Sequence, residues 1–546
     1  MKKPSKGSTP SKAKAPVKKG KSQVNPILDI LNNMDDDLIA TIKQTVLNEI
    51  EITPDLLEPE DTVDLFAEYL ELCEQENADE DDKNELLADL VSELSELQVD
   101  SNGGDPEARE SVQAIYDLLD DAIEQQSISP IDMMIIGKIF SDAAWAVPDS
   151  LKQALAQALQ IGSLANERGA PIGPAGSLVE LPDEIGKNPF DAHDYLNSIL
   201  AALPSDVSMT LLHEFIAARK PIINQAIAGF ILHPDIDIAI AVAEALSASA
   251  KSSPVESASI ERLVRMRPWL PQVRQTYLDA TIRVMRLNGL SPIKVEPVKI
   301  IKCYASVCDG SGTRSLYVTQ RLGAHYQIVM VIMKPTGVED AMVLSELPKS
   351  EMDQIVREMK SSMPVTETDL AGVARMLELA IAENLASDKL PPFKLLKVVE
   401  SIGLGSLQPD YTSPKDLLKE LLNELAPEES DSTACEKAHR EIADSEFAQQ
   451  WFEAGGAVED LLYPVKGSKK RVIALMKAYL PERRLFWARQ CAISALALRG
   501  DGKGRHSLWK QMALVGRDIA SDMPLDQIPL MNAVAKLSVK AFESRF

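Results

Sequence analysis

The chain is poor in cysteine, and this shortage limits the disulfides and cysteine-bound metal sites that it could form. Five cysteines occur among 546 residues. Cys303 and Cys308 stand close together, but five residues of a predicted strand would place them on opposite faces about 16 Å apart, which excludes a shared zinc ion or a mutual disulfide. An odd and sparse cysteine count is typical of proteins in a reducing compartment. We therefore expect a cytoplasmic protein.

Long apolar segments are missing as well. The longest runs, such as residues 326–333, fall far short of the roughly 20 residues that a membrane helix needs. The lysine-rich N-terminus is not followed by an apolar segment of the kind found in secretory signal peptides. We expect no membrane association and no secretion by that route.

Complete catalytic or metal-binding motifs are also absent from the sequence. His213 begins an HExxH-like stretch, but Ala217 stands where the second histidine belongs. A hairpin turn explains the Gly-Ser-Gly around Ser311 better than a nucleophile elbow does. The acidic runs lack the glycine and the final glutamate of an EF-hand. We therefore expect no metal and no cofactor, and lean towards a protein that is not an enzyme. One alternative stays open, namely an enzyme with an unrecognised site. The hairpin residues Asp309, Arg314 and His325 would form that site.

The sequence is rich in charged residues, which are unevenly distributed along the chain and give a net charge of −25. Residues 1–26 carry eight lysines and no acidic residue, whereas residues 27–126 carry 31 acidic residues against three basic ones. Residues 464–517 reverse the sign again, with thirteen basic residues against two acidic ones. Such blocks favour interactions with macromolecules of the opposite charge.

Periodicity and composition divide the chain into six parts. Apolar residues three and four positions apart predict helices over most of it, and Gly- and Pro-rich stretches separate the helical parts. The expected parts are a disordered basic arm (1–25), an acidic helical domain (26–161), a linker (162–189), a helical domain (190–292), a small sheet with a helix (293–362) and a C-terminal helical domain (363–546) that contains the basic segment 464–517.

The helical pattern fails between residues 298 and 344. Four runs rich in β-branched and apolar residues are separated by Asp-Gly, Gly and Pro-Thr-Gly turns, which is typical of an antiparallel meander. In the second run Leu316 and Val318 face one way, and Tyr317 and Thr319 the other. The third run is apolar on both sides, so we expect it to be a buried central strand with Met330 in the core and Thr319 partly exposed.

Three segments resemble the second half of a HEAT-type repeat. Residues 231–250 combine a turn at Pro234 and Asp235 with an Ala-rich helix, and residues 267–285 and 479–499 repeat the scheme. Small residues at crowded positions allow antiparallel helices to stack into a solenoid. The resemblance to HEAT and armadillo proteins implies a mainly α fold, a HEAT-like α-solenoid of stacked helix pairs with the β-meander inserted, and a role in binding protein partners. It implies no particular site residue.

The basic segment supplies the candidate binding surface. On a helix expected over Pro481–Arg499, Arg483 and Trp487 are four residues apart and would stack, offering a flat surface to a base. The alternative is that Trp487 packs in the core between helices. The candidate residues for an anionic ligand or partner are Lys469, Lys470, Arg471, Arg483, Arg484, Trp487, Arg489, Lys503 and Arg505.

Two hypotheses follow. The first is a non-enzymatic cytoplasmic scaffold that binds protein partners through helical repeats, including a basic partner for the acidic residues 27–126. The second is a nucleic-acid-associated factor that uses the lysine arm and the basic C-terminal surface, and its affinity would fall steeply with salt. The charges also leave open whether the acidic region covers the basic one.

Overall fold

A computed structural model describes residues 59–75, 80–103, 105–143, 145–166, 188–201, 203–217, 221–252, 257–287, 299–500 and 508–544. The chain divides into two compact units, residues 1–51 and 52–546, and every described residue belongs to the second. The predicted basic arm at 1–25 lies outside the described residues, as does most of the predicted linker at 162–189. No described helix combines the length and the hydropathy needed to cross a membrane.

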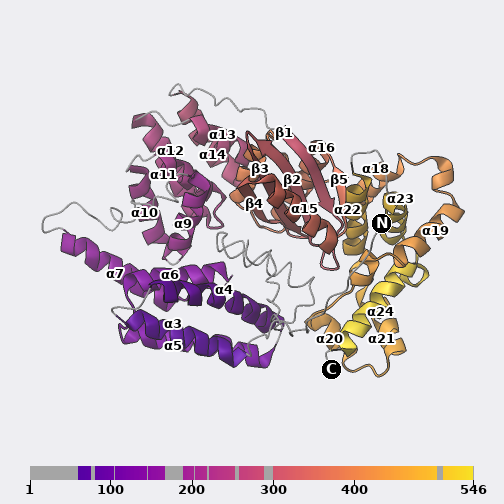
Figure 1. Cartoon of the computed structure of the whole chain (residues 1–546), viewed down its shortest axis with the longest axis horizontal. Coiled ribbons are helices and arrows are strands. Elements are labelled where there is room, and N and C mark those ends of the chain that lie inside the picture. The colour runs from indigo at the N-terminus through magenta and orange to yellow at the C-terminus, as the bar shows by residue number, and fades with distance from the viewer. Residues whose placement is uncertain are drawn as a thin grey trace, which may run out of the picture. The chain divides into compact units, whose positions relative to one another are not determined.

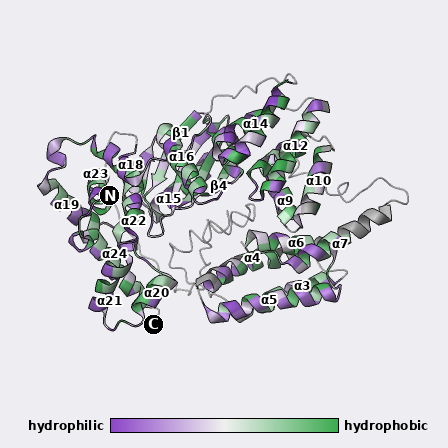
Figure 2. Ribbon diagram, turned by 180° about the vertical axis from the view of Figure 1, so that it is seen from behind, coloured by the Kyte–Doolittle hydropathy of each residue, from purple (hydrophilic) through white to green (hydrophobic). Residues whose placement is uncertain are grey.

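The acidic region folds into helices α3 (Pro59–Glu74), α4 (Glu80–Gly103), α5 (Pro106–Glu124), α6 (Pro130–Asp142) and α7 (Asp149–Asn166). Figure 2 shows polar and apolar residues mixed along α3, α4 and α5, as expected for amphipathic helices. Phe66 and Phe140 stack with ring centroids 5.9 Å apart, and the Trp145 indole donates to the Leu94 carbonyl over 2.8 Å. Asp105 and Ser129 cap α5 and α6 ahead of a proline at the first helical position.

A second group of helices follows (Figure 1). It contains α9 (Pro189–Ala201), α10 (Ser205–Ala217), α11 (Pro221–Ile227), η2 (Ala228–Leu232), α12 (Ile236–Ser252), α13 (Ser257–Met266), η3 (Arg267–Trp269) and α14 (Gln272–Leu287). Helix α12 packs against both α10 and α14. The hydroxyl of Thr281 on α14 donates to the Ala243 carbonyl of α12 over 2.9 Å, which ties the two helices together.

The predicted meander is confirmed, and a fifth strand completes the sheet. The strands are β1 (Lys299–Ser306), β2 (Arg314–Leu322), β3 (His325–Lys334), β4 (Gly337–Leu347) and β5 (Val365–Thr368), in the order β4-β3-β2-β1-β5 with every pair antiparallel. Helix α15 (Lys349–Ser362) connects β4 to β5. β5 pairs only with Cys303–Ser306 of β1, so β2 rather than β3 lies in the middle of the sheet.

The two faces of the sheet are covered by different helices, and this corrects the predicted burial of two residues. On the inner face Val318 belongs to the main core, where α16 (Leu370–Ala386) and α17 (Lys394–Ser401) pack. On the outer face Tyr317 packs beside α15. Thr319 is 2 % exposed and donates to the Lys302 carbonyl, whereas Met330 is only half-buried. The prediction of a buried Met330 and a partly exposed Thr319 is wrong. Thr319 lies between neighbouring strands and bonds to the Lys302 carbonyl, whereas Met330, opposite Tyr317 on the same outer face, is only partly covered by the cluster around Met359 of α15.

The C-terminal helices are α18 (Pro414–Leu422), η4 (Pro427–Glu429), α19 (Ser432–Ala443), η5 (Phe447–Gln450), α20 (Gly456–Leu462), α21 (Ser468–Ala474), the π-helical turn η6 (Leu475–Tyr479), α22 (Arg484–Arg499), α23 (Leu508–Ala520), η7 (Leu525–Gln527) and α24 (Pro529–Glu543). The Ser413 side chain caps α18 ahead of a proline at the first helical position. Helix α22 begins three residues later than expected, and it packs on α18, α23, β1 and β5.

Candidate functional site

The arginines predicted to form a basic surface are instead engaged in contacts within the protein. Arg483 donates to the Glu453 carboxylate over 2.8 Å, and its guanidinium lies 3.8 Å from the centroid of the Phe486 ring. Trp487 is 0 % exposed, and its indole donates to the same Glu453 oxygen over 2.8 Å. The expectation that Arg483 and Trp487 stack to face a base is wrong, because a buried carboxylate draws both side chains inward. The alternative placement of Trp487 in the core is the one found.

Glu453 is the centre of this cluster, and it also reaches Tyr479. Its side chain is 7 % exposed. Burial, and then the nearby Glu453 carboxylate, raise the pKa of the Tyr479 phenol. The backbone N–H of Glu453 donates to the Ser538 hydroxyl over 2.8 Å, which links the cluster to α24. These contacts join η6 and the start of α22 to the last helix.

Arg484 and Arg471 donate hydrogen bonds to backbone carbonyls and to groups at the ends of helices. The Arg484 guanidinium donates to the carbonyls of Ile519 and Met523, each over 2.9 Å, and to that of Ser521 between them. These carbonyls lie at or just beyond the end of α23, where no further turn of helix can satisfy them. Arg471 donates to the Val465 carbonyl over 2.8 Å and to Glu543 over 2.7 Å. Both arginines therefore join segments of the C-terminal fold.

Arg489 belongs to a buried cluster of two arginines and one glutamate. Glu383 of α16 accepts from Arg489 of α22 and from Arg314 at the start of β2. The side chains of Glu383 and Arg314 are 5 % and 3 % exposed, and that of Arg489 is 23 % exposed. One carboxylate thus joins the sheet, the helix behind it and the C-terminal helices.

The hairpin residues that would form an unrecognised enzyme site do not lie together. Arg314 pairs with Met333 at one end of the β2–β3 ladder, and His325 lies at the other end. Eight residues of strand correspond to roughly 26 Å. Asp309 accepts from the Ser311 hydroxyl and the Thr313 amide, each over 2.8 Å, and so shapes its own turn.

Two of the predicted surface residues do face solvent. Lys469 and Lys470 are exposed on α21. Ile473 of the same helix and Lys477 of η6, the turn that follows it, share their side at three- and four-residue spacing. The remaining predicted residues, Lys503 and Arg505, lie outside the described residues. Among the described residues, the predicted basic surface retains an exposed group on α21 and η6, which we call the lysine face of α21 and define as Lys469, Lys470, Ile473 and Lys477.

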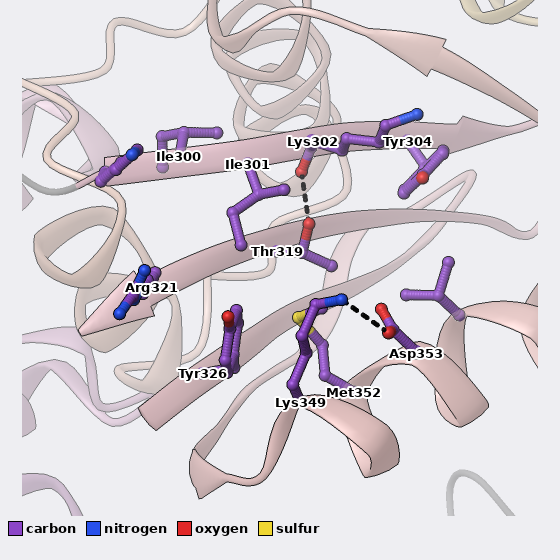
Figure 3. A pocket seen from close by; sticks show the side chains of 12 residues that line it. Ile300, Ile301, Lys302, Tyr304, Thr319, Arg321, Tyr326, Lys349, Met352 and Asp353 are labelled. Carbon is purple, nitrogen blue, oxygen red and sulfur yellow. Dashed lines mark hydrogen bonds and ion pairs between the residues drawn. The ribbon is translucent and has the colours of Figure 1, made fainter. Parts of the chain in front are cut away.

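A second basic site, which the sequence did not reveal, is an open groove of about 610 Å³ on the outer face of the sheet. Figure 3 shows side chains from three strands and α15 around it. Its lining consists of Lys299, Ile300, Ile301, Lys302, Tyr304, Thr319, Arg321, Tyr326, Lys349, Met352, Asp353 and Val356. Four of these side chains are basic and one is acidic, which makes the groove cationic in a strongly anionic chain.

Contacts among the lining residues fix the charges at the rim and the aromatic rings between them. Lys349 lies 3.4 Å from Asp353. The Arg321 guanidinium lies 5.9 Å from the centroid of the Tyr326 ring, within the range of a cation–π contact. At the other end the Lys360 ammonium stands 4.5 Å from the centroid of the Tyr304 ring. The groove therefore combines a basic rim with an aromatic and aliphatic floor.

The groove could not be predicted from the distribution of charge along the sequence, because its basic residues come from separate elements. Lys299 and Lys302 belong to β1, Arg321 to β2 and Lys349 to α15, and no short window of sequence contains them all. The clue available in the sequence is the placement of lysine and arginine at strand ends beside exposed apolar residues. Ile301, which lines the groove, is 41 % exposed.

Comparisons with known proteins match the helical regions on either side of the sheet. Residues 204–289 match the family model described as Y4lR second domain, and residues 415–543 match Y4lR C-terminal helical domain. The chain is 24 % identical over 436 residues to the uncharacterized protein y4lR of Sinorhizobium fredii (strain NBRC 101917 / NGR234), which covers 77 % of this chain and 81 % of that protein. No solved structure matches. The groove lies between the two matched ranges.

Proposed function

We propose that the protein is a non-enzymatic cytoplasmic interaction protein that holds a protein partner on a helical scaffold. The groove on the outer face of the sheet carries this proposal. It places four basic side chains around tyrosine and isoleucine, and it leaves the Ile301 side chain 41 % exposed. Basic and aromatic groups around an apolar floor are the composition of a surface that binds another macromolecule.

We also propose that α9–α14 stack in the manner of HEAT repeats, as their sequence suggests. The guanidinium of Arg274, early in α14, donates to the carbonyls of His233 and Pro234 in the turn before α12. This contact joins one instance of the pattern to the corresponding turn of the previous instance. Together with the packing of α12 on α14, it supports the stacking of equivalent helices.

A pull-down of the full chain from extract of its native cells, with and without nuclease, tests the scaffold function. We expect at least one protein partner to be retained after nuclease at near-equal stoichiometry, and to bind the purified chain again when purified itself. Loss of every partner on nuclease treatment would contradict the proposal.

The lysine face of α21 favours a second candidate function, association with nucleic acid. Its lysines are exposed on one side of a short helix, and lysines in this arrangement attract phosphates without regard to sequence. The lysine arm at 1–25 would add to this attraction. Binding to a single-stranded oligonucleotide should then weaken steeply between 50 and 200 mM salt, and weaken further in the Lys469→Glu, Lys470→Glu variant. Affinity that does not depend on salt would contradict this function.

A further inference from the structure

We propose that the groove binds an acidic segment of a protein partner in extended conformation, laid beside β1 in the row that β5 begins. The proposal rests on the proposed function and names the ligand of that scaffold. Three independent features carry it: the part of β1 that β5 does not pair, an acidic side chain of β5 that already binds at the rim, and the distribution of charge in the groove.

The first feature is the incomplete pairing of β1. On one side β1 pairs with β2 from Lys299 onwards. On the other side β5 reaches only Cys303–Ser306. Among the strands that the structure describes, none pairs with residues 299–302 on that side. An extended peptide can add its backbone to such an edge, while pockets beside the edge select its side chains.

The second feature is Glu367, which shows how an acidic strand sits there. Glu367 of β5 lies opposite Tyr304 in the ladder, on the face that carries the groove. Its carboxylate reaches diagonally to the ammonium of Lys302. A partner strand that continues the row of β5 would place an outward side chain beside Lys302, at the spacing of cross-strand neighbours. β1 bulges between Ile300 and Lys302, so beyond the bulge the next residue of β1 on this face is Lys299, opposite Arg321. Carboxylates at alternate positions would then face the basic rim.

The third feature is the pattern of charge. Lys299 and Arg321 lie opposite each other on neighbouring strands, and Lys349 stands across the groove on α15. Asp353 and Glu367 interrupt this rim. Separate carboxylates on a peptide can be placed to avoid them, whereas the continuous phosphate backbone of a nucleic acid would be repelled. The aliphatic side chains of Ile301, Met352 and Val356 in the groove suit the apolar residues of a peptide.

The test uses a fluorescein-labelled decapeptide in which glutamate alternates with threonine and valine, as in β5. Its binding to the full chain is measured by fluorescence anisotropy at 50 mM salt. In the Lys299→Glu, Arg321→Glu variant we expect the affinity to fall about tenfold, because two attractive charges become repulsive. In the matched Lys415→Glu, Lys419→Glu variant, which reverses two exposed charges on α18, we expect less than a twofold change.

Two further probes locate and identify the ligand. The same peptide with glutamine for each glutamate should lose its binding, and amide hydrogen exchange at residues 299–302 should slow when the acidic peptide is bound. Equal affinities of the two double variants would overturn the proposal. So would unchanged exchange at β1, or an oligothymidylate that binds the groove as tightly as the peptide. A partner that survives nuclease but ignores the groove variant would leave the scaffold function standing and remove this ligand.

Discussion

The basic segment 464–517 and the groove on the sheet both contain basic side chains, but the two regions use them differently. In the segment the described arginines mostly point inward, where Arg483, Arg484 and Arg489 satisfy a buried carboxylate or the carbonyls at a helix end. In the groove Lys299 and Arg321 remain at the surface. The difference shows that basic residues clustered in sequence do not make a basic surface when matching acceptors lie nearby in space. Substitutions should therefore act on stability in the segment and on binding in the groove.

The largest expected effect is at Glu383. Replacing it in Glu383→Gln removes the charge that two arginines share, and Arg314 has little access to water. Breaking a buried pair by removing one partner lowers the free energy of unfolding by about 3–5 kcal/mol. Urea denaturation monitored by circular dichroism measures this loss. The matched Glu424→Gln change at the surface pair with Arg499 should cost at most about 1 kcal/mol. Equal losses would mean that burial does not distinguish the two pairs.

A smaller loss of stability is expected at Arg484. The Arg484→Gln change leaves the carbonyls at the end of α23 without their donor, and unsatisfied buried groups cost about 1–3 kcal/mol. Urea denaturation measures it, with Arg499→Gln as the surface control. A variant as stable as wild type would show that water replaces the guanidinium. This effect also means that charge reversal at Arg484 cannot report on ligand binding alone.

In the groove the same kind of substitution should leave stability unchanged and alter affinity instead. The Lys299→Glu, Arg321→Glu variant should bind the acidic decapeptide about tenfold more weakly, which corresponds to about 1.4 kcal/mol. Its urea midpoint should stay close to that of wild type, because the two residues are exposed and surface substitutions usually change stability by less than about 0.5 kcal/mol each. A large drop in the midpoint would mean that the rim is structural.

The smallest effect is expected on the lysine face of α21. Lys469→Glu with Lys470→Glu should change the free energy of unfolding by no more than about 0.5 kcal/mol, since both side chains are exposed. Binding of the acidic decapeptide should also stay within twofold of wild type. A marked loss of peptide binding would make this face, rather than the groove, the acidic-partner site.

Local rules were enough to predict much of the fold. Period-two alternation with glycine turns located the first four strands, and apolar residues three and four positions apart located the helical parts on either side of them. β5 escaped notice because its four residues, Val-Thr-Glu-Thr, are too few to show a pattern. The inward orientation of the arginine side chains could not be predicted either, since Glu383 lies 106 residues from Arg489 in the chain. The groove could not be found because only the folded sheet brings its basic residues together.

The position of Glu383 also sets an order of assembly during synthesis on the ribosome. Arg314 lies 69 residues before Glu383, so these two can pair as soon as α16 has emerged. Arg489 follows 106 residues later, which at about 5–20 residues per second is a delay of roughly 5–20 s. Over that time β1 and β5 lack the cover that α22 provides in the finished protein. The residues that line the groove all precede α16, so the segment that forms it is synthesised before α22 becomes available to pack on β1 and β5.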